Sequence, residues 1–372
     1  MDTIISPKAL SLVSLAVLNT ILAILMRMAA ERTKFSSSVV LLMDEALKSV
    51  VCICILFRFY LHEQTANSYE VVNRSQQQVI PSVSVLGWLR FLRSTVFGSM
   101  SGFLSMGVPA ICYTIQKNLS LYAISQLSPA VYQILLQSKV LTTALFSYLI
   151  MQKEFRLNQK LSLIILFVGL SLVELSLITD NTAPPRSVEG FLVGSIAAFL
   201  ACILSGFTAV YIEYTIKKMG RTEQRSYTVW VRNLQLAIFG ILASILAVFV
   251  RDKQAINTHG IFSGFNGIVW ALIFTGSFGG LLVSLVVKYS DNVLRTFATS
   301  VAVISAGISS QFIFDIKITP LFIMGTVLVV FSIYLYSAPK RDEAEIQVEV
   351  KESKFEIAGE ADLSPISHRS ST

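Results

Sequence analysis

The sequence contains little charge. Only 14% of its 372 residues are Asp, Glu, Lys or Arg, whereas soluble globular domains carry about 25%. Its hydrophobic fraction is 53%, and its mean hydropathy is +0.65. Because a soluble core of this length cannot hide so much apolar surface, the composition predicts a membrane protein. It excludes disordered, collagen-like, coiled-coil and disulfide-rich secreted classes.

Histidine and cysteine are also scarce. The three histidines fall in predicted loops or in the C-terminal tail, and the four cysteines lie within apolar runs without the spacing of a zinc site. We therefore predict no metal site, no cofactor and no metal-centred enzyme. The net charge of +7 is spread between apolar runs, which is typical of membrane loops and not of nucleic-acid binding.

Long apolar runs make up most of the chain. Each can cross a bilayer as a helix of about 20 residues, and a helix pairs every backbone polar group internally. We therefore expect an all-α membrane protein with ten transmembrane helices. The predicted spans cover residues 9–26, 36–59, 95–116, 122–150, 159–178, 190–216, 229–250, 267–287, 293–314 and 320–336.

A Pro184-Pro185 loop divides these spans into two sets of five, at about residues 9–180 and 187–337. This division predicts two inverted five-helix repeats, an arrangement found in many transporters. Residues 61–93 are predicted to form a cytosolic loop, and residues 338–372 a disordered cytosolic tail. With both termini in the cytosol, about 13 basic residues lie on the cytosolic side and about 8 on the other, which favours this orientation.

Ionisable residues within the spans are the candidate functional residues, because a charge at membrane depth is costly and usually faces a cavity. Glu45 and Lys48 are spaced i, i+3, so they share a helix face and form either a structural ion pair or part of a site. Lys139 has no acid within one turn. Lys288 and Arg295 bracket the junction of the eighth and ninth spans, where Lys288 either binds a ligand or extends to the interface.

Unpaired lysines in a polar cavity favour an anionic ligand, and a phosphate suits a compact point charge with three donors. Tyr113, Tyr132 and Tyr211 can stack on, or hydrogen-bond to, a nucleobase or a sugar. These residue types predict a carrier for a phosphorylated organic anion and leave its identity open.

Five sequence blocks occur between about residue 9 and residue 337. They are Pro109-x-x-x-Tyr113-x-x-Gln116-x-Asn118; Tyr132-Gln133 with 139–147; Ser205-Gly206-Phe207-x-x-Val210-Tyr211-x-Glu213; Trp230-Val231-Arg232-Asn233-Leu234-Gln235; and Gly279-Gly280 through Lys288-Tyr289-x-Asp291-Asn292 to Ser300. In this order they resemble the nucleotide-sugar transporter family, which includes the Golgi carriers of UDP-galactose, UDP-N-acetylglucosamine and CMP-sialic acid.

The resemblance implies a drug/metabolite transporter fold in the Golgi membrane, with the endoplasmic reticulum as the alternative. It also implies exchange of a nucleotide sugar for the nucleoside monophosphate. Lys139, Asn233 and Lys288 match residues that line the family's nucleotide site. The other expected substrate-binding residues lie in or beside family motifs: Gln116, Tyr132, Thr143, Ser205, Tyr211, Glu45 and Lys48. The oligomeric state stays open, with a homodimer as one option.

Ala237 bears on the choice of nucleotide. In the family that the sequence resembles, CMP-sialic acid carriers have a tyrosine at the position of Ala237, whereas UDP-sugar carriers have a small residue. We therefore expect a UDP-sugar, with galactose or N-acetylglucosamine preferred, exchanged for UMP. One alternative is a CMP-sialic acid/CMP antiporter. The other is a non-transporting scaffold of the same fold, because Lys117 alters the family's Gln-Asn-Asn and Leu135-Leu136-Gln137-Ser138-Lys139 lacks the family's tyrosine. A multi-pass enzyme would need a clustered acid, histidine or metal motif, and none is seen in the sequence.

Overall fold

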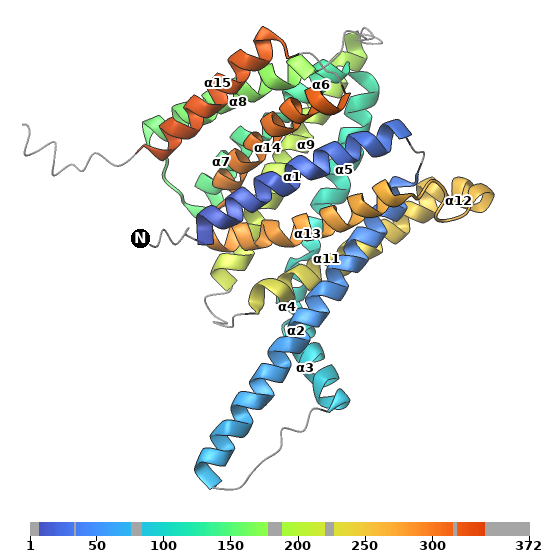
Figure 1. The fold of residues 1–372 in the computed structure, drawn as a ribbon, viewed down its shortest axis with the longest axis vertical. Coiled ribbons are helices and arrows are strands. Elements are labelled where there is room, and N and C mark those ends of the chain that lie inside the picture. Colours follow the sequence, from blue (N-terminus) through green and yellow to red (C-terminus); the bar gives the residue numbers. More distant parts are fainter. Residues whose placement is uncertain are drawn as a thin grey trace, which may run out of the picture.

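The computed structural model describes residues 7–32, 35–75, 84–177, 188–219, 227–314 and 318–338, and every regular element in these ranges is a helix (Figure 1). Two helices end in a wider π turn, labelled η1 and η2. The elements are α1 (Pro7–Arg32), α2 (Ser37–Ser75), α3 (Val85–Phe97), α4 (Met100–Ser105), α5 (Gly107–Gln126), α6 (Pro129–Leu136), α7 (Lys139–Met151), α8 (Leu157–Leu177), α9 (Val188–Tyr214), η1 (Thr215–Met219), α11 (Thr228–Ala247), η2 (Val248–Asp252), α12 (Lys253–His259), α13 (Gly267–Tyr289), α14 (Asn292–Phe314) and α15 (Pro320–Ser337).

Polar residues and prolines in the sequence fix several helix starts. Ser128 and Thr319 each precede a proline, and their side-chain oxygens accept backbone hydrogen bonds from Val131 and Phe322. At the start of α13, the side chain of Asn266 accepts from two backbone N–H groups, both at 3.0 Å. These caps satisfy donors that have no partner within the helix.

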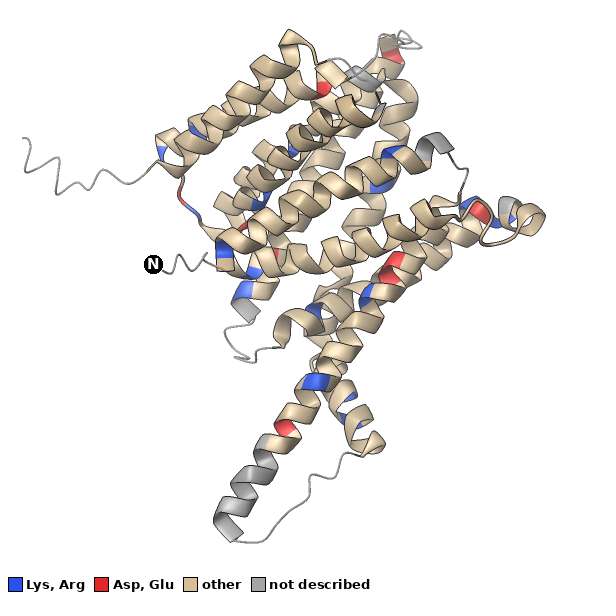
Figure 2. Cartoon of the chain, viewed as in Figure 1, with Lys and Arg blue, Asp and Glu red and all other residues tan. Residues whose placement is uncertain are grey.

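Among the residues that the structure describes, eight helices, some with their π extensions, are long and apolar enough to cross a membrane. A ninth candidate is the pair Val85–Phe97 and Met100–Gln126, which is bent by 61°. α2 is not among these candidates, and it carries Asp44, Glu45 and Lys48 within its apolar run. Figure 2 shows that charge is sparse over most helices, whereas α2 carries both signs. The prediction of an all-helical membrane protein is confirmed, while ten spans in two repeats stay a prediction.

Two predicted boundaries are wrong. The sequence places the end of the third span at residue 116 and the start of the fourth at 122, but α5 continues through Gln126. The chain breaks instead at Leu127-Ser128, where Leu127 is extended and the Ser128 cap starts a new helix. The apolar run is nearly unbroken here, so hydropathy gives no signal for the change of direction. The cap residue followed by proline gives that signal.

The predicted loop at residues 61–93 is also largely helical where it is described. α2 continues to Ser75 and α3 begins at Val85, so that both extend beyond the rest of the bundle (Figure 1). The Tyr60 ring lies 5.6 Å from Trp88 and 5.4 Å from Phe91, and Phe91 contacts Tyr227 of the neighbouring segment. These aromatic contacts hold α3 against α2. Residues 178–187 and 339–372, which include the predicted repeat junction and most of the tail, lie outside the described residues.

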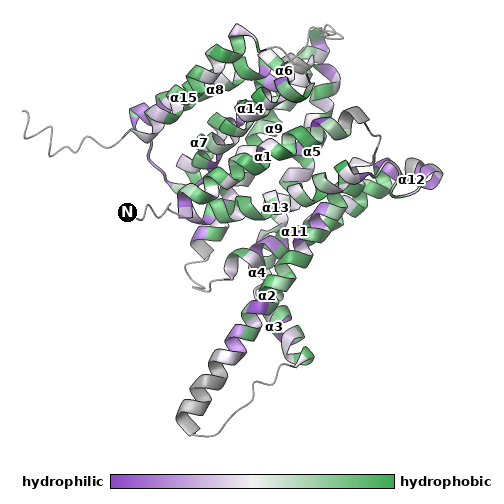
Figure 3. Ribbon diagram, viewed as in Figure 1, coloured by the Kyte–Doolittle hydropathy of each residue, from purple (hydrophilic) through white to green (hydrophobic). Residues whose placement is uncertain are grey.

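The bundle is held together by helix pairs that approach through small residues. α8 packs along α15, α5 along α9, α2 along α11, and α1 along both α13 and α14. A Cβ placed on Gly169 would lie 3.0 Å from the carbonyl oxygen of Gly325, and one on Gly325 would lie 2.8 Å from that of Gly169. Without a hydrophobic drive between helices in lipid, such close backbone approach supplies the packing energy. The apolar residues that remain exposed cover the outside of the bundle (Figure 3).

Gly206 tests this packing. A Cβ at this position would lie 2.7 Å from the backbone carbon of Thr142 and 2.8 Å from the backbone nitrogen of Thr143, so α9 and α7 would have to separate. We expect Gly206→Ala to lower the free energy of unfolding by about 1–3 kcal/mol, measured by thermal melting of the purified protein. Gly267→Ala is the matched control, because no atom lies within 4 Å of the added Cβ. Equal melting of the two variants would contradict the packing account.

Candidate functional site

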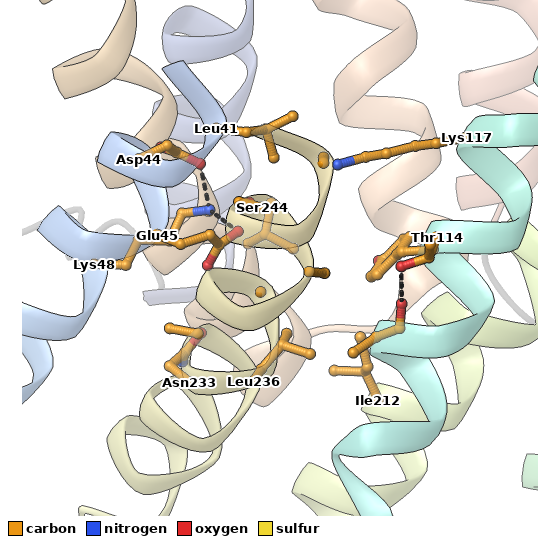
Figure 4. A pocket seen from close by; sticks show the side chains of 18 of the residues that line it. Leu41, Asp44, Glu45, Lys48, Thr114, Lys117, Ile212, Asn233, Leu236 and Ser244 are labelled. Carbon is orange, nitrogen blue, oxygen red and sulfur yellow. Dashed lines mark hydrogen bonds and ion pairs between the residues drawn. The ribbon is translucent and has the colours of Figure 1, made fainter. Parts of the chain in front are cut away.

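One cavity of about 680 Å³ lies between α2, α5, α9, α11, α13 and α14 (Figure 4). Its volume falls within the range of about 300–1,000 Å³ that is usual for small-molecule sites. At one end its lining residues are exposed, among them Lys117, Asn118 and Arg251. At the other end they are buried, among them Ala209 and Asn292. These two ends are called the exposed end and the buried end below.

A charged triad from α2 forms one wall of the cavity. The Lys48 Nζ lies 2.7 Å from Asp44 Oδ2 and 3.2 Å from Glu45 Oε1 (Figure 4). Ser277 of α13 donates a hydrogen bond to Asp44 Oδ1 at 2.7 Å. The predicted pairing of Glu45 with Lys48 is therefore confirmed, and Asp44 is a second partner. One lysine shared by two carboxylates leaves the wall with a formal excess of negative charge.

Three glycines on the facing helices make room for this triad. A Cβ on Gly240 of α11 would lie 2.8 Å from the Glu45 carboxyl carbon. On α13, a Cβ on Gly280 would lie 2.6 Å from Lys48 Cε, and one on Gly276 would lie 3.2 Å from Asp44 Oδ1. Each charged side chain therefore packs against a glycine, whose lack of a side chain leaves the space that the charged group occupies.

The opposite wall of the cavity is basic. Lys117 of α5 points across the cavity toward the triad (Figure 4). Arg251, in η2, donates a hydrogen bond from Nη2 to Asn118 Oδ1 at 2.5 Å. We did not select Lys117 or Arg251 as binding residues from the sequence. A lysine within an apolar run is a usable signal for Lys117, whereas Arg251 at the end of its run looks like an ordinary interfacial cation.

A polar network lies behind the buried end. Glu213 is 2% exposed. Its Oε1 accepts from Lys217 at 2.5 Å, and its Oε2 accepts from the Asn292 backbone N–H at 3.0 Å and from Asn292 Nδ2 at 2.9 Å. Lys217 also donates to the carbonyl oxygen of Ser290. These bonds tie the end of α9 and η1 to the junction of α13 and α14.

A second ion pair extends this network to the other half of the bundle. Lys153, in the turn between α7 and α8, lies 2.6 Å from Asp291 Oδ2 and donates to the Tyr336 hydroxyl at 3.2 Å. We call the whole set the closing network: Lys153, Glu213, Lys217, Ser290, Asp291, Asn292 and Tyr336. It connects four separate segments of the chain across the buried end of the cavity.

Burial disfavours the charged forms of Lys153 and Asp291, but their mutual attraction outweighs it. Burial lowers the pKa of Lys153, yet the charge of Asp291 and the bonds to Asp291 and Tyr336 hold that pKa above its ordinary value. Burial raises the pKa of Asp291, yet Lys153 and the backbone N–H of Leu294 hold that pKa below its ordinary value. Both groups are therefore charged at neutral pH.

Three of the predicted binding residues line the cavity: Glu45, Lys48 and Asn233. The Asn233 side chain is fixed at both ends, because its Nδ2 donates to the Val229 carbonyl at 2.9 Å and its Oδ1 accepts from Ser284 at 2.8 Å. Their role in binding stays a prediction, but their common location agrees with it.

The other seven predicted binding residues lie outside the cavity lining: Gln116, Tyr132, Lys139, Thr143, Ser205, Tyr211 and Lys288. Thr143 donates to the backbone carbonyl of Lys139 at 2.7 Å, and Tyr211 packs against Phe207 with ring centroids 5.7 Å apart. Lys288 is exposed, with its Nζ 5.5 Å from the Tyr289 ring centroid. Their binding roles also stay predictions.

Lys139 lies at the start of α7, where its residue is exposed. The Lys139 ammonium is attracted by the carboxylate of Glu174 in α8 and repelled by the guanidinium of Arg295 in α14. No carboxylate of the described residues lies within 4 Å of its Nζ.

Comparison with known proteins identifies the family. Residues 4–337 match the nucleotide-sugar transporter family. The chain belongs to this family. It is therefore a transporter and not an enzyme. The nucleotide-sugar transporter is 34% identical to the human UDP-galactose translocator, over 90% of this chain and 78% of that protein.

Two further relatives and one solved structure are also similar to this chain over most of its length. The transporter is 33% identical to the rat UDP-N-acetylglucosamine transporter, over 88% of this chain and 94% of the relative. It is 32% identical to a Caenorhabditis elegans UDP-N-acetylglucosamine/UDP-N-acetylgalactosamine transporter, over 92% and 97% of the two chains. A solved crystal structure is 12% identical in sequence and aligns with a TM-score of 0.58, over 88% of this chain and 97% of the other. This similarity concerns the fold alone.

The Lys153–Asp291 pair predicts a pH dependence of stability. A lowered pKa of Asp291 in the folded state gives stability that is present above the ordinary pKa and is lost as the pH falls below about 4. A raised pKa of Lys153 gives stability that is lost only as the pH rises above about 10.4. We expect Asp291→Asn to lower stability by about 1 kcal/mol, by a constant amount between about pH 5 and pH 9.

Thermal melting of wild type and Asp291→Asn across this range checks the prediction, and the difference should shrink below about pH 4. Glu189→Gln, at the exposed start of α9, is the control, because no described cation lies within 4 Å of that carboxylate. A difference for Asp291→Asn that grows on acidification would refute the assignment.

Proposed function

We propose that this nucleotide-sugar transporter exchanges a UDP-sugar for UMP by alternating access, with UDP-galactose or UDP-N-acetylglucosamine preferred. The match over most of the chain to transporters named for these two sugars carries the proposal. The cavity agrees with it, because it combines cations on one side with hydrogen-bond acceptors on the other. Such a cavity suits a ligand with a phosphate part and a hydroxyl-rich part.

In this proposal α2 is the tenth transmembrane span. α2 packs along both α11 and α13, and its charged triad faces the cavity and those helices. The charged side chains therefore need not contact lipid, so the cost of placing a charge in the bilayer does not prevent α2 from spanning the membrane. The ten spans then form two inverted repeats of five. The start of α1 and the end of α15 lie toward the same side of the bundle (Figure 1), which agrees with an even number of spans and with both termini in the cytosol.

The two ends of the cavity fit one step of an alternating-access cycle. The closing network covers the buried end, which lies on the side of the termini, while the residues at the other end are exposed. With both termini in the cytosol of a Golgi-membrane protein, the exposed end faces the lumen. The conformation is then the one that releases sugar nucleotide and accepts UMP. Opening to the cytosol requires the closing network to separate.

Reconstituted exchange tests this function. Purified protein in liposomes is loaded with UMP, CMP or buffer, and entry of labelled UDP-galactose, UDP-N-acetylglucosamine and CMP-sialic acid is measured. We expect UMP inside to accelerate entry of the UDP-sugars, because one cavity serves both ligands and shared nucleotide binding drives the same alternation. Preference for CMP-sialic acid would establish the alternative antiporter, and no exchange with any pair would indicate a non-transporting protein.

Ala237 tests the nucleotide preference. Its side chain is 1% exposed and lines the cavity, so a larger residue at this position takes up ligand space. We expect Ala237→Tyr to reduce UDP-sugar exchange at least about tenfold, an energy of about 1.4 kcal/mol, while Ala237→Ser retains it. Undiminished UDP-sugar exchange by the tyrosine variant would show that residue size at this position does not set the preference.

A further inference from the structure

The cavity reaches the outer surface of the bundle between α5 and α11. Its lining includes Leu246 of α11 and Val250 of η2, which are 63% and 73% exposed. Both lie within the candidate membrane span Thr228–Asp252, and exposed apolar side chains of a span contact lipid. The cavity therefore opens sideways into the bilayer as well as at its exposed end.

Small side chains line this lateral opening on both sides. They are Ala110 and Thr114 of α5, and Ala243 and Ala247 of α11. Thr114 lies on the side of α5 that faces α11 (Figure 4), and its hydroxyl donates to the Ala110 carbonyl at 3.0 Å. Because that hydroxyl is satisfied within its own helix, the lining of the lateral opening is apolar in effect.

Two contacts between the helices set the length of the lateral opening. At the deep end, a Cβ on Gly107 would lie 3.4 Å from two ring carbons of Phe239. At the other end, Arg251 donates to Asn118 Oδ1 at 2.5 Å. From Phe239 to Arg251 the helix rises about 18 Å, and half of the hydrocarbon core of a bilayer is about 15 Å thick. The lateral opening therefore extends over about one leaflet.

The surface end of the lateral opening carries two cations. Arg251 is the penultimate residue of its candidate span, which places it where lipid headgroups begin. The next residue, Asp252, accepts from the Ser36 hydroxyl instead. Lys117 is attracted by Glu45 across the cavity and repelled by Arg251. In the described ranges no carboxylate lies within 4 Å of the charged nitrogens of Lys117 or Arg251, so an anion between them would offset their repulsion.

We propose that a phospholipid binds in the lateral opening, with its phosphate on Lys117 and Arg251 and one acyl chain between α5 and α11. An ammonium and a guanidinium both form charge-assisted hydrogen bonds to phosphate oxygens. A soluble anion uses the two cations but leaves the apolar stretch deeper in the bilayer unfilled, which is why the observations favour a lipid. The inference rests on the membrane location of the chain and does not depend on which nucleotide sugar is carried.

Lipid binding to the purified full-length protein in detergent tests the proposal. The probe is dioleoylphosphatidylglycerol, and its dissociation constant is measured by native mass spectrometry. Two partial probes are measured beside it: glycerol 3-phosphate, which lacks the acyl chains, and dioleoylglycerol, which lacks the phosphate. We expect the complete lipid to bind at least about tenfold more tightly than glycerol 3-phosphate and about fivefold or more tighter than dioleoylglycerol.

Two variants separate the headgroup from the chain. We expect Lys117→Gln to weaken lipid binding about fivefold, the contribution of one basic residue near a membrane surface, and to leave dioleoylglycerol binding unchanged. Ala247→Phe fills the lateral opening and should weaken binding of both the lipid and dioleoylglycerol at least about tenfold. Lys160→Gln is the matched control, because it removes an exposed lysine from the first turn of α8, outside the cavity lining.

Three results would overturn the proposal. Equal weakening by Lys117→Gln and Lys160→Gln would show a general attraction to anionic lipid, and equally tight binding of glycerol 3-phosphate would show a site for soluble anions. Unchanged lipid binding by Ala247→Phe, with folding verified by thermal melting, would place the acyl chain elsewhere. If Ala247→Phe is not recovered folded, Thr114→Phe takes its place, since Thr114 is exposed and fills the lateral opening from the other helix.

Discussion

Lys48 lies between two carboxylates of α2, which packs along α11 and α13, and the arrangement of these three helices follows from this contact. The triad can stay charged only if it is enclosed by protein or by a polar cavity. The face of α2 that carries the triad therefore cannot meet lipid, and α11 and α13 pack against α2. Gly240 and Gly280 let those helices approach closely enough to do so.

The same constraint explains why the cavity has two chemically different walls. The acidic wall comes from neighbouring turns of a single helix, whereas the basic residues come from α5, η2 and α14. A motion that separates these helices changes the distance between the walls while the triad stays intact. The closing network behaves differently, because its bonds join different segments and break when those segments part.

Much of the fold could be predicted from the sequence, because long apolar runs leave the chain few options. The span predicted at 267–287 corresponds to a helix at Gly267–Tyr289. The prediction failed where hydropathy is uniform, as at Leu127-Ser128, and where aromatic contacts distant in sequence support a helix, as at Tyr60 and Trp88. Neither feature changes the local apolar pattern that defined the spans.

The site was less predictable. Charge inside an apolar run identified Glu45 and Lys48, because the cost of burying a charge is visible in the sequence itself. The grouping of Lys117, Arg251 and Arg295 around one cavity depends on how three distant segments pack, and no local pattern encodes that.

The length of α2 has a mechanical consequence. Its 39 residues contain neither glycine nor proline, so it forms an unbroken rod of about 58 Å at 1.5 Å per residue. One end carries the triad, and the other extends past the bundle beside α3 (Figure 1). A tilt of about 10° around the cavity end moves the far end by about 10 Å over this length. A change in the tilt of α2 at the cavity would therefore have its largest effect at the far end of the helix, on the side of the protein where α3 lies.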